Sequence, residues 1–195
     1  AVQLAPLKTD LKNEALGRIA EALQQNARAI VAANQEDLAE AQKNNLAPPL
    51  LKRLKFDEAK IADVCAGIHS LIQLEDPVGK IESMWKRPNG LLIGKMIVPL
   101  GVIGIIYESR PNVTVDVAGL CLKAGNAVIL RGGSEAINSN SVLIDILTDA
   151  LKNSKVPPDS IQFVRNTSRE AVYEMLKLDD YIDVIIPVSY THLRA

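Results

Sequence analysis

The chain has 195 residues, and its 48% apolar content provides enough material for one folded domain or slightly more. Its 22 basic and 23 acidic side chains give a formal net charge of -1, so no overall field attracts nucleic acid or an anionic membrane, and we expect neither as a partner. No apolar run approaches the roughly 18 residues of a membrane span, and the chain begins without the pattern of a signal peptide, which predicts a cytoplasmic protein.

The first third of the sequence has the apolar spacing of α-helices. Apolar residues recur every three or four positions from Thr9, a predicted N-cap, to Val31, which indicates one long helix. Asn34 is predicted to cap a second helix that ends near Asn44, and Asp57 is predicted to cap a third. We therefore expect the first 83 residues to form an N-terminal helical segment.

The pattern changes at Asn89-Gly90, a dipeptide typical of tight hairpin turns. The apolar residues on its two sides predict a β-hairpin over residues 84–98. Over residues 99–187, short apolar runs alternate with helical patterns. The predicted strands begin at Val102, Ala127, Ile161 and Ile182. Buried strands separated by helices predict an α/β fold with a parallel sheet that helices cover on both faces.

Two segments follow predicted strands, at the positions where a nucleotide-binding sheet meets its ligand. The first runs from Tyr107 to Asn112 and contains a proline that presets the first turn of a helix. The second runs from Arg131 to Glu135. Its two glycines permit close approach to a ligand, Ser134 can cap the next helix, and Arg131 offers a cation suited to the 2′-phosphate of NADP. An ordinary Gly-Gly turn remains the alternative.

The two cysteines, Cys65 and Cys121, lie far apart, without a CxxC motif or a histidine cluster beside them. Neither a disulfide framework nor a metal site is therefore expected. Each cysteine follows the apolar spacing of a predicted helix and has no recognisable base nearby, so we expect buried structural thiols and no catalytic nucleophile in this chain.

Two runs of sequence carry a resemblance to a known family. Residues 98–114 read VPLGVIGIIYESRPNVT, and residues 122–133 read LKAGNAVILRGG. Both closely resemble the γ-glutamyl phosphate reductases, or glutamate-5-semialdehyde dehydrogenases, of the aldehyde dehydrogenase superfamily. That superfamily binds its cofactor with a variant of the Rossmann sheet, which agrees with the absence of a G-x-G-x-x-G fingerprint here. The resemblance implies an aldehyde-dehydrogenase-like fold, in which N-terminal helices precede a variant Rossmann sheet, in truncated form.

The resemblance also implies a function. It is that of an oxidoreductase of proline biosynthesis, in which NADPH reduces L-glutamate 5-phosphate to L-glutamate 5-semialdehyde and phosphate. The family's nucleophilic cysteine lies beyond this sequence, so the chain alone is expected to be inactive, and the full-length protein is expected to be a homo-oligomer. The residues implied for NADP binding are Tyr107, Glu108, Ser109, Arg131, Gly132, Gly133, Ser134 and Glu135. Those implied for the substrate are Arg110 and Asn112.

Residues 188–195 depart from the family, which continues with an Arg-Gly-Gly turn where this chain reads VSYTHLRA. We interpret them as a foreign tail after the NADP-binding region of residues 99–187. Two other interpretations stay open. One is an acylating aldehyde dehydrogenase with another substrate. The other is a non-catalytic module that binds a nucleotide or assembles through its hairpin, whose edge could pair with another chain.

Overall fold

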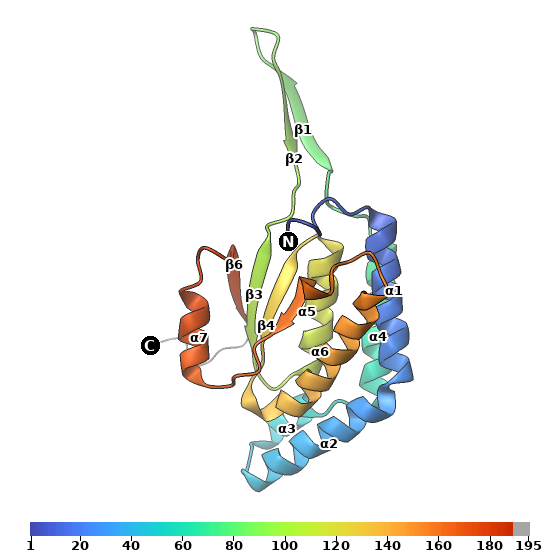
Figure 1. Cartoon of the computed structure of the whole chain (residues 1–195), viewed down its shortest axis with the longest axis vertical. Helices are drawn as coiled ribbons and strands as arrows, with labels where there is room; N and C mark the ends of the chain where they lie inside the picture. Colours follow the sequence, from blue (N-terminus) through green and yellow to red (C-terminus); the bar gives the residue numbers. More distant parts are fainter. Residues whose placement is uncertain (189–195) are drawn as a thin grey trace.

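The computed structural model describes residues 1–188, which form seven α-helices and six β-strands (Figure 1). The helices are α1 (Thr9–Gln25), α2 (Ala27–Lys43), α3 (Pro48–Leu54), α4 (Glu58–Gln73), α5 (Pro111–Lys123), α6 (Ile137–Lys152) and α7 (Arg169–Leu176). The strands are β1 (Ile81–Lys86), β2 (Leu92–Met96), β3 (Val102–Tyr107), β4 (Ala127–Arg131), β5 (Ile161–Phe163) and β6 (Val184–Val188). None of the helices within residues 1–188 has the length and apolar character needed to cross a bilayer.

Four strands form the predicted parallel sheet, in the order β5-β4-β3-β6. The chain adds β4 and β5 on one side of β3 and then returns to add β6 on the other. In register, Val102 lies opposite Ala127 of β4, and Ile103 lies opposite Val184 of β6. Val188, which we had assigned to the tail, continues β6, and residues 189–195 of that predicted tail lie outside the described residues.

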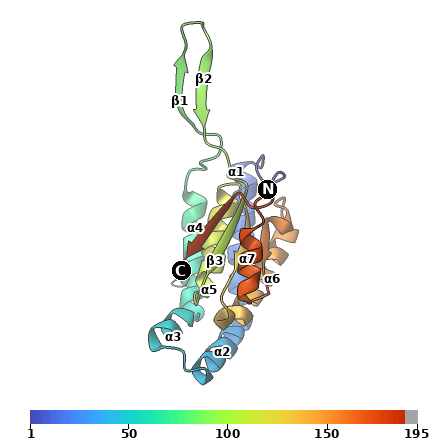
Figure 2. The same cartoon turned by 90° about the vertical axis from the view of Figure 1, so that its left-hand side faces the viewer.

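Helices cover both faces of the sheet, as predicted (Figures 1 and 2). Because side chains of a strand alternate between faces, neighbouring residues of β3 enter different cores. Ile105 and Tyr107 belong to the large core that also contains residues of α1, α4, α5 and α6. Ile106 lies between them and packs with Val172 and Met175 of α7 on the opposite face.

The N-terminal helices share their core with the sheet. Leu16 of α1 and Ile68 of α4 lie in one buried cluster with Val115 of α5 and Leu143 of α6. Each such side chain contributes about 1.5–3 kcal/mol when it is fully buried. The N-terminal helical segment and the sheet therefore share one core, and β1 begins at Ile81, before the predicted hairpin start at residue 84.

Two asparagines differ from the prediction. Asn26 separates α1 from α2, because its side chain donates to the Ala22 carbonyl (2.8 Å) and competes with the helix. Asn34, predicted to cap a helix, is buried in the middle of α2. Its side chain donates to the Leu54 carbonyl (2.9 Å) and accepts from the Phe56 amide (2.6 Å). The predicted cap was wrong because these tertiary partners hold the side chain.

Of the other two predicted N-caps, Asp57 caps its helix and Thr9 does not. Asp57 caps α4 as predicted and accepts from the Lys60 amide (3.1 Å). Thr9 is the first residue of α1 instead of its N-cap, and its hydroxyl donates to Asp76 (2.8 Å). Pro48 begins α3, a helix that was not predicted, since proline fits the first turn of a helix.

The antiparallel β1–β2 hairpin stands away from the body in both views (Figures 1 and 2). Its Asn-Gly turn is present as predicted, with a φ of 87° at Gly90 and a hydrogen bond from the Leu91 amide to Asn89 (3.2 Å). Several large apolar side chains on the hairpin and its flanks are exposed. They are Ile81, Met84, Trp85, Leu91, Leu92, Met96, Val98 and Leu100.

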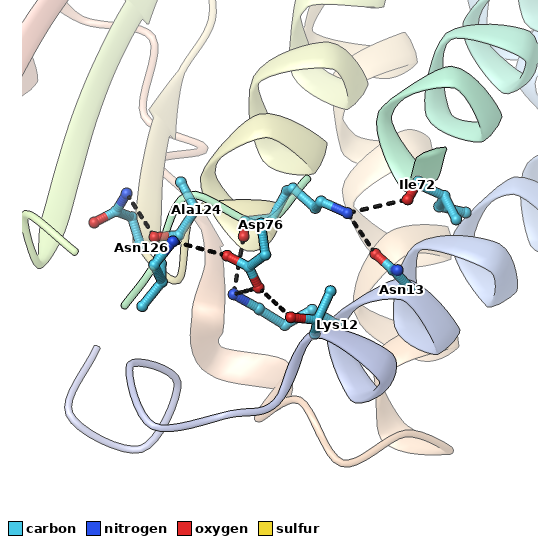
Figure 3. A network of polar contacts seen from close by, with 9 residues as sticks. Lys12, Asn13, Ile72, Asp76, Ala124 and Asn126 are labelled. Atoms are coloured by element: carbon cyan, nitrogen blue, oxygen red, sulfur yellow. Dashed lines mark hydrogen bonds and ion pairs between the residues drawn. The ribbon is translucent and has the colours of Figure 1, made fainter. Parts of the chain in front are cut away.

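A buried polar network joins the root of this hairpin to the body (Figure 3). The Lys12 ammonium lies 2.6 Å from the Asp76 carboxylate and donates to the Lys123 carbonyl (3.0 Å). The Lys123 ammonium in turn donates to the Asn13 side chain (2.8 Å) and to the Ile72 carbonyl (3.1 Å). The network ties α1 and the ends of α4 and α5 to the segment that leads into β1.

Candidate functional site

The sheet brings the two predicted loops together at one edge. β3 and β4 are parallel neighbours, with Ile106 opposite Arg131, so the loops that follow them start side by side. Glu135 connects the loops, because one of its carboxylate oxygens accepts from the Ser109 amide (2.5 Å) and from the Ser109 hydroxyl (2.7 Å). Ser109 adopts a left-handed backbone with a φ of 48°, which turns the chain from β3 into α5.

The Tyr107 side chain does not lie at this edge. It is 1% exposed, and its hydroxyl lies 2.6 Å from the Thr114 hydroxyl, which donates to Asn140 (2.8 Å). Burial also raises the pKa of Tyr107 far above its ordinary value. This side chain fixes β3, α5 and α6 to one another, and the cofactor contact of Tyr107 stays a prediction.

Arg131 is also turned inward. It is 4% exposed, and its guanidinium donates to the carbonyls of Thr167 (2.6 Å) and Ser168 (3.2 Å), which precede α7. This cation holds the loop that leads into α7, and its contact with a 2′-phosphate stays a prediction. The sequence pattern alone could not distinguish these two uses of an arginine after a strand.

Both glycines of the Gly132-Gly133 turn have side chains of the same chain close to them. A Cβ on Gly132 would collide with the buried amide of Asn140, and a Cβ on Gly133 would collide with the Glu135 carboxylate. Ser134 lies in a short 3-10 turn over residues 134–136 and makes no capping hydrogen bond, so the prediction that it caps the next helix was wrong.

The cap of α6 comes from another helix. Asp37 of α2 accepts from the amides of Asn138 (3.1 Å) and Ser139 (2.8 Å), as well as from the Ser139 hydroxyl (2.5 Å). Sequence reasoning missed this residue. The available signal was that Asp37 falls on the same helical face as the buried Ile30 and Ala41, where an acid needs a partner.

The two predicted substrate residues begin α5, whose first helical residue is Pro111. Arg110 occupies the N-cap position and makes no capping hydrogen bond with its side chain. Asn112 donates to Asp116 (3.0 Å) and lines a hollow of about 290 Å³ between α4 and α5. Burial raises the pKa of Asp116, partly offset by the hydrogen bond from Asn112. Glu108, half-buried, completes the turn after β3.

Neither cysteine has the properties of a nucleophile. Cys65 and Cys121 are both buried, and burial raises the pKa of each thiol, that of Cys121 to about 11. Little thiolate exists at neutral pH under these conditions. Across residues 1–188 there is also no group of three or more His, Cys, Asp or Glu side chains that could hold a metal ion.

Comparisons with known proteins give a consistent result. No protein-family model matches the sequence. A curated γ-glutamyl phosphate reductase from Caldanaerobacter subterraneus is 56% identical over 191 residues, which cover 98% of this chain and 46% of that relative. The crystal structure of γ-glutamyl phosphate reductase from Thermotoga maritima matches 97% of this chain and 46% of its own, with a TM-score of 0.94 and 40% identity. A propionaldehyde dehydrogenase from Clostridium phytofermentans covers 96% of this chain and 39% of its own, with a TM-score of 0.70 and 15% identity.

The parallel sheet, its covering helices and the joined loops at its edge define an α/β protein with the aldehyde-dehydrogenase-like fold. Within that class the chain is homologous to γ-glutamyl phosphate reductase, which confirms the resemblance seen in the sequence. The chain spans about half the length of the curated relatives it matches.

Proposed function

We propose that this chain is the cofactor-binding part of a γ-glutamyl phosphate reductase of proline biosynthesis. The full enzyme would reduce L-glutamate 5-phosphate to L-glutamate 5-semialdehyde and phosphate, with NADPH as the reductant. The observation that carries the proposal is the 56% identity over 98% of the chain to a reductase of that name. The fold implies a nicotinamide cofactor, and the choice of NADP, a homo-oligomeric state and a cytoplasmic location belong to the proposal.

The residues at the sheet edge fit such a cofactor. α5 begins there without a side-chain cap, and Arg110 at its N-cap position brings a cationic residue to the start of a helix, where an anion would be stabilised. The Glu135 carboxylate can accept hydrogen bonds from ribose hydroxyls, and Ser109 holds it in place. When bound, the nicotinamide group supplies the hydride. The contribution of this chain is to bind and orient it.

The chain would be inactive alone because the reaction needs a thiolate. The acyl group must pass from phosphate to sulfur before reduction, and both thiols of this chain are buried with raised pKa values. Joining residues 1–188 to the part of the Caldanaerobacter relative that the chain does not match should create an active reductase. A folded chimera without NADPH-dependent turnover of L-glutamate 5-phosphate would contradict the proposal.

Calorimetric titration of the chain with NADPH and NADH tests the cofactor part directly. Binding that prefers NADPH is the expected result. Because Arg131 is buried against the Thr167 and Ser168 carbonyls, Arg131→Ala should weaken both cofactors to a similar degree. A selective loss of NADPH would instead assign the 2′-phosphate to Arg131. A folded chain that binds neither cofactor would argue against a cofactor-binding half.

A second candidate function, assembly, rests on the projecting hairpin. Its exposed side chains include Met84 (53%), Trp85 (45%) and Leu92 (59%), and an isolated two-stranded hairpin is only marginally stable in water. A second copy of the chain would bury this surface. Sedimentation analysis should give an oligomer for the chain and a monomer for a variant with Trp85→Lys and Leu92→Lys. A monomer in both cases would remove assembly through the hairpin.

A further inference from the structure

The N-terminus of α6 is filled by an anion that the chain itself provides. Asp37 is only 3% exposed, and all three of its hydrogen bonds described above come from Asn138 and Ser139 in the first turn of α6. Helix N-termini attract anions, and α6 follows the loop after β4, where a sheet of this class would offer a helix to a phosphate. In this chain that position is already taken.

A second polar side chain of α2 strengthens the connection. Asn34 lies one turn before Asp37 and donates to the Ser139 hydroxyl (3.0 Å), which donates to Asp37. Asn34 also holds the segment between α3 and α4 through Leu54 and Phe56. The first turn of α6 is therefore bonded to two side chains on one face of α2 and can shift only if α2 shifts with it.

This fixed turn also determines where Glu135 lies. Only two residues separate Glu135 from Asn138, and its carboxylate receives both donors of Ser109 across the edge of the sheet. Asp37 and Glu135 also line the same cavity, of about 260 Å³, together with Glu40. The connection thus runs from Asp37 by hydrogen bonds to the first turn of α6, then along the backbone to Glu135, and from Glu135 by hydrogen bonds to Ser109.

We propose that Asp37 is a positioning residue of this site. Its carboxylate occupies the N-terminus of α6, keeps phosphate groups of a ligand away from that helix, and holds Glu135 against Ser109. The role of Asp37 in holding Glu135 for a ligand rests on the proposed function, because it assumes that the loops bind a cofactor. The occupation of the helix terminus rests on the hydrogen bonds alone.

Anion rescue tests whether Asp37 occupies the N-terminus of α6. Thermal unfolding of the wild-type chain, Asp37→Ala and Asp37→Asn is measured in sodium sulfate and in sodium chloride of equal ionic strength. Glu40→Ala is the matched control, because Glu40 lies on the same helix and lines the same cavity but makes no described hydrogen bond to α6. Asp37→Ala should gain more stability from sulfate than the wild type and Glu40→Ala do, since the emptied terminus can bind the ion.

Asp37→Asn keeps an oxygen acceptor and should recover part of the lost melting temperature without the additional response to sulfate. If Asp37→Ala does not fold, Asp37→Ser repeats the comparison, because its shorter side chain leaves space for an anion. An equal sulfate response in the wild type and in Asp37→Ala, or in Asp37→Ser where that variant replaces it, would overturn the assignment of the helix terminus.

Hydrogen exchange and cofactor titration test whether Asp37 holds Glu135 against Ser109. Asp37→Ala should speed exchange of the Ser109 amide and weaken NADPH binding about tenfold, whereas Glu40→Ala should change neither. An unchanged Ser109 amide in Asp37→Ala would overturn the positioning role. If the wild-type chain binds no nicotinamide cofactor, the proposed function fails, and the Ser109 exchange and the sulfate response still decide the role of Asp37.

Discussion

Replacing Asp76 by asparagine should strongly destabilise the chain, because it leaves a buried ammonium without its counter-ion. The Lys12 side chain is 0% exposed and the Asp76 side chain 10% exposed, at a separation of 2.6 Å. Removing one partner of a buried ion pair costs about 3–5 kcal/mol. We expect the lower end of that range, since Lys12 keeps its hydrogen bond to the Lys123 carbonyl.

Removing the other partner of the ion pair, by Lys12→Met, should reduce the free energy of unfolding by less than Asp76→Asn does. Asp76 then retains the Thr9 hydroxyl (2.8 Å) and the Val78 amide (3.0 Å), so the loss is about 1.5–3 kcal/mol, the value of one hydrogen bond to a charged group. The double variant should lose less stability than the sum of the two single variants, because it leaves neither charge unpaired.

Urea unfolding of the wild type, the two single variants and the double variant at neutral pH measures these differences. Additive losses, or an Asp76→Asn effect below about 1 kcal/mol, would refute the ion-pair reasoning. Asp149→Asn, in an exposed pair with Lys152, is the control and should have no measurable effect.

The same pair predicts a dependence on pH. Burial acts to raise the pKa of Asp76, but hydrogen bonds from Lys12, Thr9 and Val78 outweigh it, and the pKa lies below its ordinary value. A lowered pKa in the folded state means that the stabilisation is complete above the unfolded pKa of about 3.9 and is lost as the pH falls through the folded value. Stability of the wild-type chain should therefore fall below about pH 4, and Asp76→Asn should lose less in that range. Parallel pH profiles would contradict this assignment.

Three further predictions concern the body of the fold. Tyr107→Phe should cost about 1 kcal/mol in urea unfolding and leave cofactor affinity unchanged, because its hydroxyl lies inside the core; a selective loss of affinity would show that it acts at the site. Cys121, with a pKa of about 11, should react with iodoacetamide at neutral pH no faster than the chain unfolds, and rapid alkylation of the folded chain would contradict its burial. Gly132→Ala should destabilise the chain, because its Cβ would collide with Asn140. Gly67→Ala in α4, where a Cβ meets nothing within 4 Å, should instead stabilise the chain by about 0.5–1 kcal/mol. Equal melting temperatures for the two variants would show that the space around each Cβ does not decide stability.

The features that the sequence predicted correctly depend on neighbours along the chain. Apolar runs located the strands of the sheet, the Asn-Gly pair located the hairpin, and Asp57 caps α4 through an amide three residues away. The parallel direction of the strands followed from the alternation of strands and helices. Because the strands are parallel, the loops that carry Ser109 and Glu135 lie at one edge of the sheet.

The features that the sequence did not predict depend on residues far away. Asn34 and Asp37 are bound by partners about 20 to 100 positions along the chain, so their use as tertiary connectors cannot be seen in local patterns. Tyr107 and Arg131 stand at the predicted strand ends, but both side chains point into the interior. Spacing identifies where a strand ends, whereas the direction of a side chain there depends on what packs against it.

The network at the root of the hairpin also couples this surface element to the folding of the body. Lys12 and the Lys123 carbonyl are separated by 111 positions, and Asp76 lies between them in the sequence. The network can therefore form only when α1, the segment before β1 and the end of α5 have met, which makes it a contact of high sequence separation. A partly folded chain would carry the same apolar hairpin without a fixed direction. The lysine-aspartate pair thus couples the segment that leads into the hairpin to the packing of α1 against α5, so the apolar hairpin has a fixed root only in the folded body.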